Sequence, residues 1–180
     1  MKRSNWRTRL IQGVVLVAAV AVIFSLAAQR GATLTSGAVA PALVLPTLDG
    51  GRLDLQALRG RPVVLNFFAT WCPPCRTEMS ELRSFQQAHP EVTVVGVALD
   101  SGDAAQVRAF AARYGVNFPV ALADEATGAR FGVSQLPTTY VVQPDGRLGR
   151  SFVGAISERT LARATAGLSS GADCATGGAC

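Results

Sequence analysis

Residues 66–79 read NFFATWCPPCRTEM, and this stretch joins a predicted strand to a predicted helix. Before the junction, residues 62–69 are largely apolar, which is typical of a strand that is buried on both faces. After it, residues 73–88 place apolar side chains three positions apart along one face of a helix. Cys72 and Cys75 therefore stand where a buried strand ends and the first long helix begins.

Strand and helix signals continue on both sides of this junction. Strands at 43–45 and 52–54 flank a glycine turn at 49–51, which predicts a hairpin. Parallel strands need helical crossovers, whereas hairpins add antiparallel edges. The order therefore predicts an α/β fold, with a mixed sheet, helices on both faces and an N-terminal β-hairpin extension. Downstream, the expected elements are a strand at 92–99, a helix at 103–114, a strand at 118–121, a helix at 125–131, strands at 138–143 and 147–153, and a helix at 158–168.

The N-terminal part carries a basic segment, residues 1–9, followed by an apolar run, residues 10–28. A run of about 19 residues is long enough to span a bilayer as a helix. Basic residues on its N-terminal side keep that side in the cytoplasm. We therefore predict a single-pass transmembrane signal-anchor in a bacterial cell membrane, with the catalytic domain on the extracytoplasmic, periplasmic side. The pattern at 25–27 also fits a signal peptidase site, so secretion after cleavage stays an alternative.

The rest of the chain divides into a linker, one domain and a tail. Residues 29–40 are rich in Gly, Ser, Thr and Ala, which predicts a flexible linker. Residues 41–168 have the size of a single domain. Residues 169–180 are again small and Gly-rich, and we expect a flexible tail that contains Cys174 and Cys180.

The net charge of +5 does not indicate a nucleic-acid surface. Five of the 17 basic residues flank the apolar run, and the other twelve equal the 12 acidic residues in number. The part of the chain that follows the run is therefore close to neutral, and we expect no nucleic-acid partner.

The Cys72–Cys75 spacing fits a redox pair, half of a zinc site, or two unrelated cysteines. A structural zinc site needs four ligands, which this chain could draw only from its tail cysteines and its single histidine, His89. The position at a helix start favours the redox pair, because free N–H groups and the helix dipole stabilise a thiolate there. We therefore predict no metal site.

The same position divides the roles of the two thiols. Cys72 is predicted to be exposed. It is also predicted to be the attacking sulfur, because the helix start lowers the pKa of its thiol. Cys75, one turn further in, is predicted to resolve the mixed disulfide. Pro73 and Pro74 suit the first helical turn, where a missing N–H group costs little, and they stiffen the ring that the disulfide closes.

Four further residues are candidates for supporting roles. Glu78 returns to nearly the helix face of Cys75, where it either accepts that thiol's proton or complements the helix dipole as an ordinary acidic residue. Glu81, one turn on, is expected on the solvated face. Trp71 forms part of the substrate surface or packs in the core. From spacing alone, Pro137 is a trans proline at a strand edge, although a cis bond at a turn would also fit.

The quoted stretch resembles the thioredoxin superfamily, and more narrowly the TlpA, ResA and CcmG group of extracytoplasmic thiol–disulfide oxidoreductases. The similarity covers about residues 40–168 and includes the motifs at 114–120, 136–140 and 144–147. It implies a thioredoxin-like fold in which Pro137 is cis and lies against the cysteine pair. It also implies that Glu78 tunes the thiols. The implied substrate-binding residues are Trp71, Pro73, Pro74, Leu136 and Thr138.

The resemblance also implies an activity and partners. The working group is a redox-active disulfide, Cys72–Cys75, without a further cofactor. The family keeps protein thiols reduced in an oxidising compartment, with apocytochrome c in cytochrome c maturation as a common client. The usual electron source is a membrane thiol carrier of the DsbD/CcdA type. We therefore expect an enzyme, a protein-disulfide reductase, that acts as a monomer.

Two other functions are compatible with such a fold. Thiol peroxidases carry a threonine three residues before the active cysteine, but that residue is Ala69 in this chain. Copper chaperones usually need a histidine ligand, and His89 stands at the far end of the predicted helix. The tail cysteines Cys174 and Cys180 do not match the family, and they either form a local disulfide or relay electrons to Cys72. We favour a tail that is inert or holds a local disulfide over a relay.

Overall fold

The computed structural model describes residues 11–13, 15, 16, 18 and 34–168 of the chain. The chain divides into two units, Met1–Ala32 and Thr33–Cys180, and the described residues of the first unit are helical. Within the described residues, no helix combines the length and the apolar character that crossing a bilayer requires. Most of the predicted membrane span and both tail cysteines lie outside the described residues. The span and the local tail disulfide therefore stay predictions.

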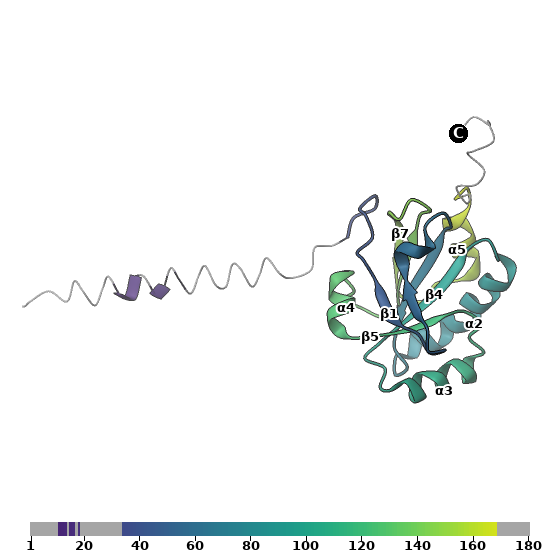
Figure 1. Ribbon diagram of the computed structural model, residues 1–180, viewed down its shortest axis with the longest axis horizontal. Helices are drawn as coiled ribbons and strands as arrows, with labels where there is room; N and C mark the ends of the chain where they lie inside the picture. The colour runs from purple at the N-terminus through teal and green to yellow at the C-terminus, as the bar shows by residue number, and fades with distance from the viewer. Residues whose placement is uncertain (1–10, 14, 17, 19–33, 169–180) are drawn as a thin grey trace, which may run out of the picture. The chain divides into compact units, whose positions relative to one another are not determined.

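A five-stranded mixed sheet forms the centre of the second unit (Figure 1). Its strand order is β5-β4-β3-β6-β7. Strands β3, β4 and β5 are parallel, whereas β6 pairs antiparallel with β3 and β7 antiparallel with β6. This mixed sheet confirms the predicted fold class. The strands span Val63–Phe68 (β3), Thr93–Leu99 (β4), Val120–Ala123 (β5), Thr138–Val142 (β6) and Leu148–Val153 (β7).

The helices of this unit begin at side chains that cap them. Asp103, Asp124 and Ser157 each accept a hydrogen bond from the backbone N–H group three residues on, which satisfies a free donor at the helix start. Gly115 ends α3 in the left-handed conformation (φ 62°), which glycine adopts without a steric penalty. The helices span Pro73–Ala88 (α2), Ala104–Tyr114 (α3), Glu125–Arg130 (α4) and Glu158–Thr165 (α5).

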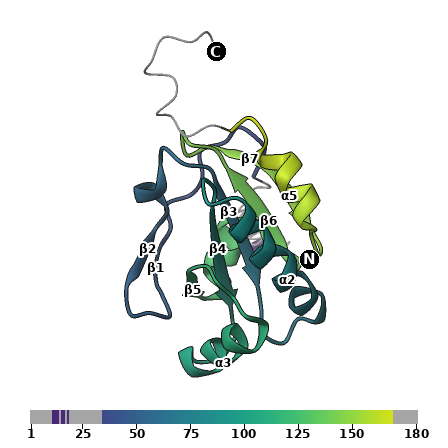
Figure 2. The same ribbon diagram turned by 90° about the vertical axis from the view of Figure 1, so that its right-hand side faces the viewer.

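Helices α2, α3 and α5 cover one face of the sheet, and the hairpin covers the other (Figures 1 and 2). Alternate residues of β3 point to the two faces, so Val64 and Phe68 pack with α2, α3 and α5, whereas Leu65 and Phe67 pack with the other layer. That other layer contains the hairpin and Phe131, which follows α4. The hairpin consists of β1 (Val44–Pro46) and β2 (Arg52–Asp54), and the 3-10 helix η1 (Leu55–Leu58) follows it.

The structure differs from the sequence-based expectation at the start of the domain. Gly37 N–H donates to Leu148 O (2.7 Å), Leu148 N–H donates to Ala38 O (2.8 Å), and Ala40 is buried. Part of the predicted linker, residues 29–40, therefore belongs to the folded unit. The physical reason is that the edge strand β7 presents unpaired backbone groups, which this small-residue segment satisfies. Helix η1 was also not predicted, and α5 ends at Thr165 rather than at 168.

The packing of α2 on the sheet yields a test of stability. Leu82 is fully buried on this helix, whereas Ser80 is exposed. Replacing Leu82 with Ala should lower the free energy of unfolding by about 2–5 kcal/mol, because it leaves a cavity under α2. Ser80→Ala on the opposite face should change it by less than about 0.5 kcal/mol. Urea unfolding of the oxidised proteins measures both values, and equal effects would contradict this packing.

Candidate active site

The two cysteines lie at the first turn of α2, as the sequence predicts. Cys72 is the N-cap residue, and the Cys75 N–H group donates a hydrogen bond to the Cys72 sulfur (3.3 Å). The first two helical positions are Pro73 and Pro74, which have no N–H group. The N–H group of Cys75 is therefore the first in the helix that can donate a hydrogen bond to the Cys72 sulfur. Cys72 and Cys75 form a disulfide, with their Cα atoms 5.3 Å apart.

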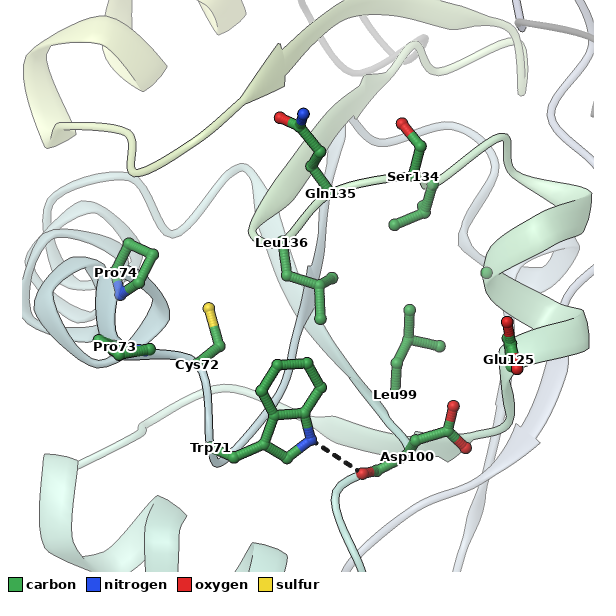
Figure 3. A pocket seen from close by; sticks show the side chains of 12 residues that line it. Trp71, Cys72, Pro73, Pro74, Leu99, Asp100, Glu125, Ser134, Gln135 and Leu136 are labelled. Carbon is green, nitrogen blue, oxygen red and sulfur yellow. Dashed lines mark hydrogen bonds between the residues drawn. The ribbon is translucent and has the colours of Figure 1, made fainter.

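The expectation that Cys72 is exposed is wrong for this disulfide form. Only 3% of Cys72 is accessible, and Cys75 is fully buried. Cys72 belongs to the buried apolar cluster on the face of the sheet that α2 covers, but its sulfur still faces a pocket of about 410 Å³ (Figure 3). The residues that line this pocket are Trp71, Cys72, Pro73, Pro74, Leu99, Asp100, Glu125, Gly128, Val133, Ser134, Gln135 and Leu136.

Trp71 lies on the surface of this pocket rather than in the core. Its side chain is 61% exposed, which excludes the core-packing interpretation. The indole Nε1–H donates to the carbonyl oxygen of Asp100 (3.1 Å), a residue with a positive φ of 40° (Figure 3). Next to it, Thr70 N–H donates to Ser101 Oγ (3.2 Å). The loop after β4 therefore holds the loop that carries Trp71.

The loop that ends at Pro137 lines the pocket with Val133, Ser134, Gln135 and Leu136. The Leu136–Pro137 peptide bond is cis, which the family resemblance implied and spacing alone did not. Leu136 lines the pocket opposite Cys72, whereas Pro137 and Thr138 are buried and do not line it. The Thr138 hydroxyl donates to Gln135 O (2.8 Å), so this side chain is engaged inside the protein.

Glu78 is buried below the cysteines, with 1% of its surface exposed. Its Oε1 accepts a hydrogen bond from Asn66 Nδ2 (2.9 Å) and its Oε2 accepts one from Ile156 N (3.2 Å). Burial raises the pKa of Glu78 to about 7, although both hydrogen bonds act to lower it. A carboxyl group with this pKa can take up or release a proton near neutral pH. The alternative interpretation of Glu78, an ordinary acidic residue that complements the helix dipole, does not fit this burial and raised pKa.

Sequence reasoning did not single out three residues that surround these groups. Asn66 stands alone as a polar residue in the otherwise apolar β3, and this was the signal that could have identified it. Asp100 and Ile156 act through backbone groups, which leave no mark in the sequence. Glu81 was expected in solvent, but it is half-buried and accepts a hydrogen bond from Glu158 N (2.9 Å) at the start of α5.

The chain is similar to proteins of known sequence and structure. Residues 36–151 match the AhpC/TSA family. The thioredoxin-like protein YneN of Bacillus subtilis is 35% identical over 131 residues, which cover 71% of this chain and 77% of that protein. The thiol-disulfide oxidoreductase ResA of Bacillus subtilis is 34% identical, with 72% of this chain and 73% of ResA covered. The crystal structure of a secreted Mycobacterium tuberculosis disulfide oxidoreductase homologous to E. coli DsbE has a TM-score of 0.64 and 30% identity, and the match covers 71% of this chain and 96% of that one.

The raised pKa of Glu78 predicts how stability depends on pH. Between its ordinary value of 4.5 and about 7, the folded protein keeps a proton that the unfolded chain has lost. This group therefore makes the free energy of unfolding fall as the pH rises through that window. Glu78→Gln cannot ionise, so its stability relative to the original protein should rise by about 2–3 kcal/mol from pH 5 to pH 8, at about 1.4 kcal/mol per pKa unit.

Urea unfolding of the oxidised proteins at both pH values measures this change. Glu91→Gln is a matched control, because Glu91 is exposed and its pKa is lowered by its own backbone and by His89. The prediction fails if Glu78→Gln and Glu91→Gln change in parallel with pH.

Proposed function

Because the chain belongs to the AhpC/TSA family and is a thiol–disulfide oxidoreductase of thioredoxin-like fold, we propose that it reduces disulfide bonds of proteins outside the cytoplasm. One observation carries this proposal. The sulfur of Cys72 faces a pocket while it is bonded to the buried Cys75, so one thiol can meet a client and the other can close the ring behind it.

The reaction begins with the reduced pair. The Cys72 thiolate attacks one sulfur of the client disulfide, so a Cys72–client bond forms, the client bond breaks, and the released client thiolate takes up a proton. The Cys75 thiol gives its proton to a base and attacks the Cys72 sulfur. The ring closes, and the second client thiolate leaves and is protonated. Two electrons pass from the pair to the client, and a dithiol donor must return them.

The local geometry supports these steps. The Cys75 N–H group that meets the Cys72 sulfur in the disulfide stabilises negative charge at that sulfur when the pair opens. Glu78 lies three residues after Cys75 on the buried face of α2. Its pKa of about 7 suits a group that accepts the Cys75 proton during resolution.

The pocket wall supports a protein client. Trp71 presents a large exposed ring, and Pro73, Pro74 and Leu136 add apolar surface around the Cys72 sulfur. A wall of this kind accommodates an extended apolar segment beside a cysteine. We assign substrate contact to these four residues. For Thr138, whose side chain is engaged internally, only backbone contact fits.

The setting of the reaction is part of the proposal. A secreted relative and the apolar run at 10–28 support a position outside the cytoplasm, either tethered to the membrane or released after cleavage. In an oxidising compartment, such a pair stays reduced only if electrons reach it across the membrane. This supply requires a thiol carrier of the DsbD/CcdA type. Apocytochrome c cysteines are the client class that we propose, with the enzyme acting as a monomer.

Two alternatives fit the site less well. A thiol peroxidase would use a hydroxyl group before its cysteine, and the buried Ala69 offers none. A copper chaperone would draw on His89, but this residue caps the other end of the 16-residue α2, about 24 Å from the cysteines at 1.5 Å per residue. Its ring instead stacks on Phe85 and lies 3.0 Å from Glu91.

The direction of electron flow can be measured. We expect the reduction potential of the Cys72–Cys75 pair to lie below about −200 mV, because a reductase must donate electrons to client disulfides. Equilibration with glutathione or dithiothreitol buffers gives this value. A potential near about −120 mV, where strong oxidants lie, would instead identify an enzyme that forms disulfides.

The client can be trapped. Cys75→Ser removes the resolving thiol, so Cys72 should stay linked to its clients as mixed disulfides that dithiothreitol releases. Cys72→Ser is the matched control and should trap none. Mass spectrometry of the trapped species from the native compartment identifies them. Trapping through Cys75 alone would reverse the assigned roles, and rapid stoichiometric consumption of peroxide by Cys72 would favour the peroxidase.

A further inference from the structure

We propose that Asn66 is a positioning residue for the thiol–disulfide reaction, because its amide nitrogen holds the Glu78 carboxylate and the Thr139 hydroxyl in one buried network. The proposal rests on the proposed function and deepens it. In this proposal, Asn66 on β3 holds the Glu78 carboxylate of α2 at a fixed position relative to β6, the strand that follows Pro137.

The network is built around a single nitrogen atom. Asn66 lies in the central strand β3 and has no exposed surface. Its Nδ2 donates to Glu78 Oε1 (2.9 Å) and to Thr139 Oγ1 (2.9 Å). The register of β3 and β6 places Asn66 directly opposite Thr139. Both hydrogens of the amide are therefore used, one toward the helix and one toward the neighbouring strand.

The carbonyl oxygen of the same amide shows that stability alone does not explain this residue. Within the described part of the chain, Asn66 Oδ1 has no hydrogen-bond partner. A buried polar atom without a partner costs free energy. Val64 and Phe68, on the same face of β3, avoid that cost. The two contacts of the nitrogen are therefore the better explanation for an amide at this position.

A second set of hydrogen bonds connects the Pro137 loop with Glu78. The carbonyl oxygen of Pro137 accepts a hydrogen bond from Gly154 N (2.8 Å). Two residues later, Ile156 N donates to Glu78 Oε2 (3.2 Å). The Pro137 loop and Glu78 are thus connected through Asn66 on one side and through the segment after β7 on the other. This arrangement fixes the carboxylate from both oxygens.

The donors that hold Glu78 are neutral. Within the described residues, no cation pairs with Glu78, and its hydrogen bonds come from Asn66 and the Ile156 backbone. The carboxylates on the elements packed around it are Glu81 of α2 and Glu158 of α5, and Glu81 accepts the Glu158 N–H group. The arginines of α5 are exposed. If the Asn66 donor is lost, no charged group among the described residues is therefore in place to compensate for it.

The first test replaces Asn66 with Leu. We expect the Glu78 titration, followed by carboxyl ¹³C NMR in the oxidised protein, to move up by about one pH unit. Resolution of a Cys72 mixed disulfide at pH 7 should then slow about fivefold, because fewer molecules carry the carboxylate. Val64→Ala, on the same face of β3, should leave the titration in place. Equal titrations in Asn66→Leu and Val64→Ala would overturn the proposal.

The second test separates the two arms of the network. In Thr139→Val the amide can turn its carbonyl toward Glu78, which favours the protonated carboxyl, so the titration should move up by less than in Asn66→Leu. Thr139→Ser keeps the hydroxyl and should restore the original value. The double variant of Asn66→Leu and Thr139→Val should titrate like Asn66→Leu alone, whereas fully additive shifts would show independent residues and overturn the proposal.

The titration is read without any client protein. A chain that traps no client through Cys72 therefore reveals failure of the proposed function, while the NMR values report on the network by themselves.

Discussion

One hydrogen bond organises the reactive end of this molecule: the Cys75 N–H group meets the Cys72 sulfur at the start of α2. It exists because Pro73 and Pro74 occupy the two positions before Cys75 and supply no donors. It keeps its geometry because the face of α2 that carries Cys75 is buried against the sheet. A shift of the helix would move the donor and the sulfur relative to each other, so the packing of the core and the chemistry of the pair are not separable.

The fold was largely predictable because its signals are local. The apolar run of β3, which only Asn66 interrupts, the capping residue Asp103 and the stop at Gly115 each act within a few positions of the chain. The bounds of α2 agree with the prediction for the same reason. The sheet order could be anticipated only as a class, since pairing between distant strands follows from packing that periodicity does not encode.

The site was predictable in its cysteines and much less in its surroundings. Trp71 and Asp100 are 29 positions apart, and Asn66 and Thr139 are 73 apart. Neither contact follows from spacing, because the sheet brings these residues together. The burial of Cys72 belongs to the same class, since Cys72 joins a buried cluster whose other members include residues far away in the sequence. Long-range contacts of this kind decide how accessible a thiol is and how acidic its neighbour becomes.

The N-terminal part of the domain covers both edges of the sheet. Val39 bridges to Arg147, directly before β7, and Thr47 bridges to Ala121 of β5. Open strand edges template pairing with other chains, so these bridges guard against intermolecular strand addition. The guarding segment is synthesised before both of these strands, and β7 is the last strand of the sheet to be made. In a nascent chain, the segment around Val39 therefore stays unpaired until almost the whole domain, including β7, has been synthesised. Aggregation is most favoured in that interval, because the segment is still free to pair with another chain.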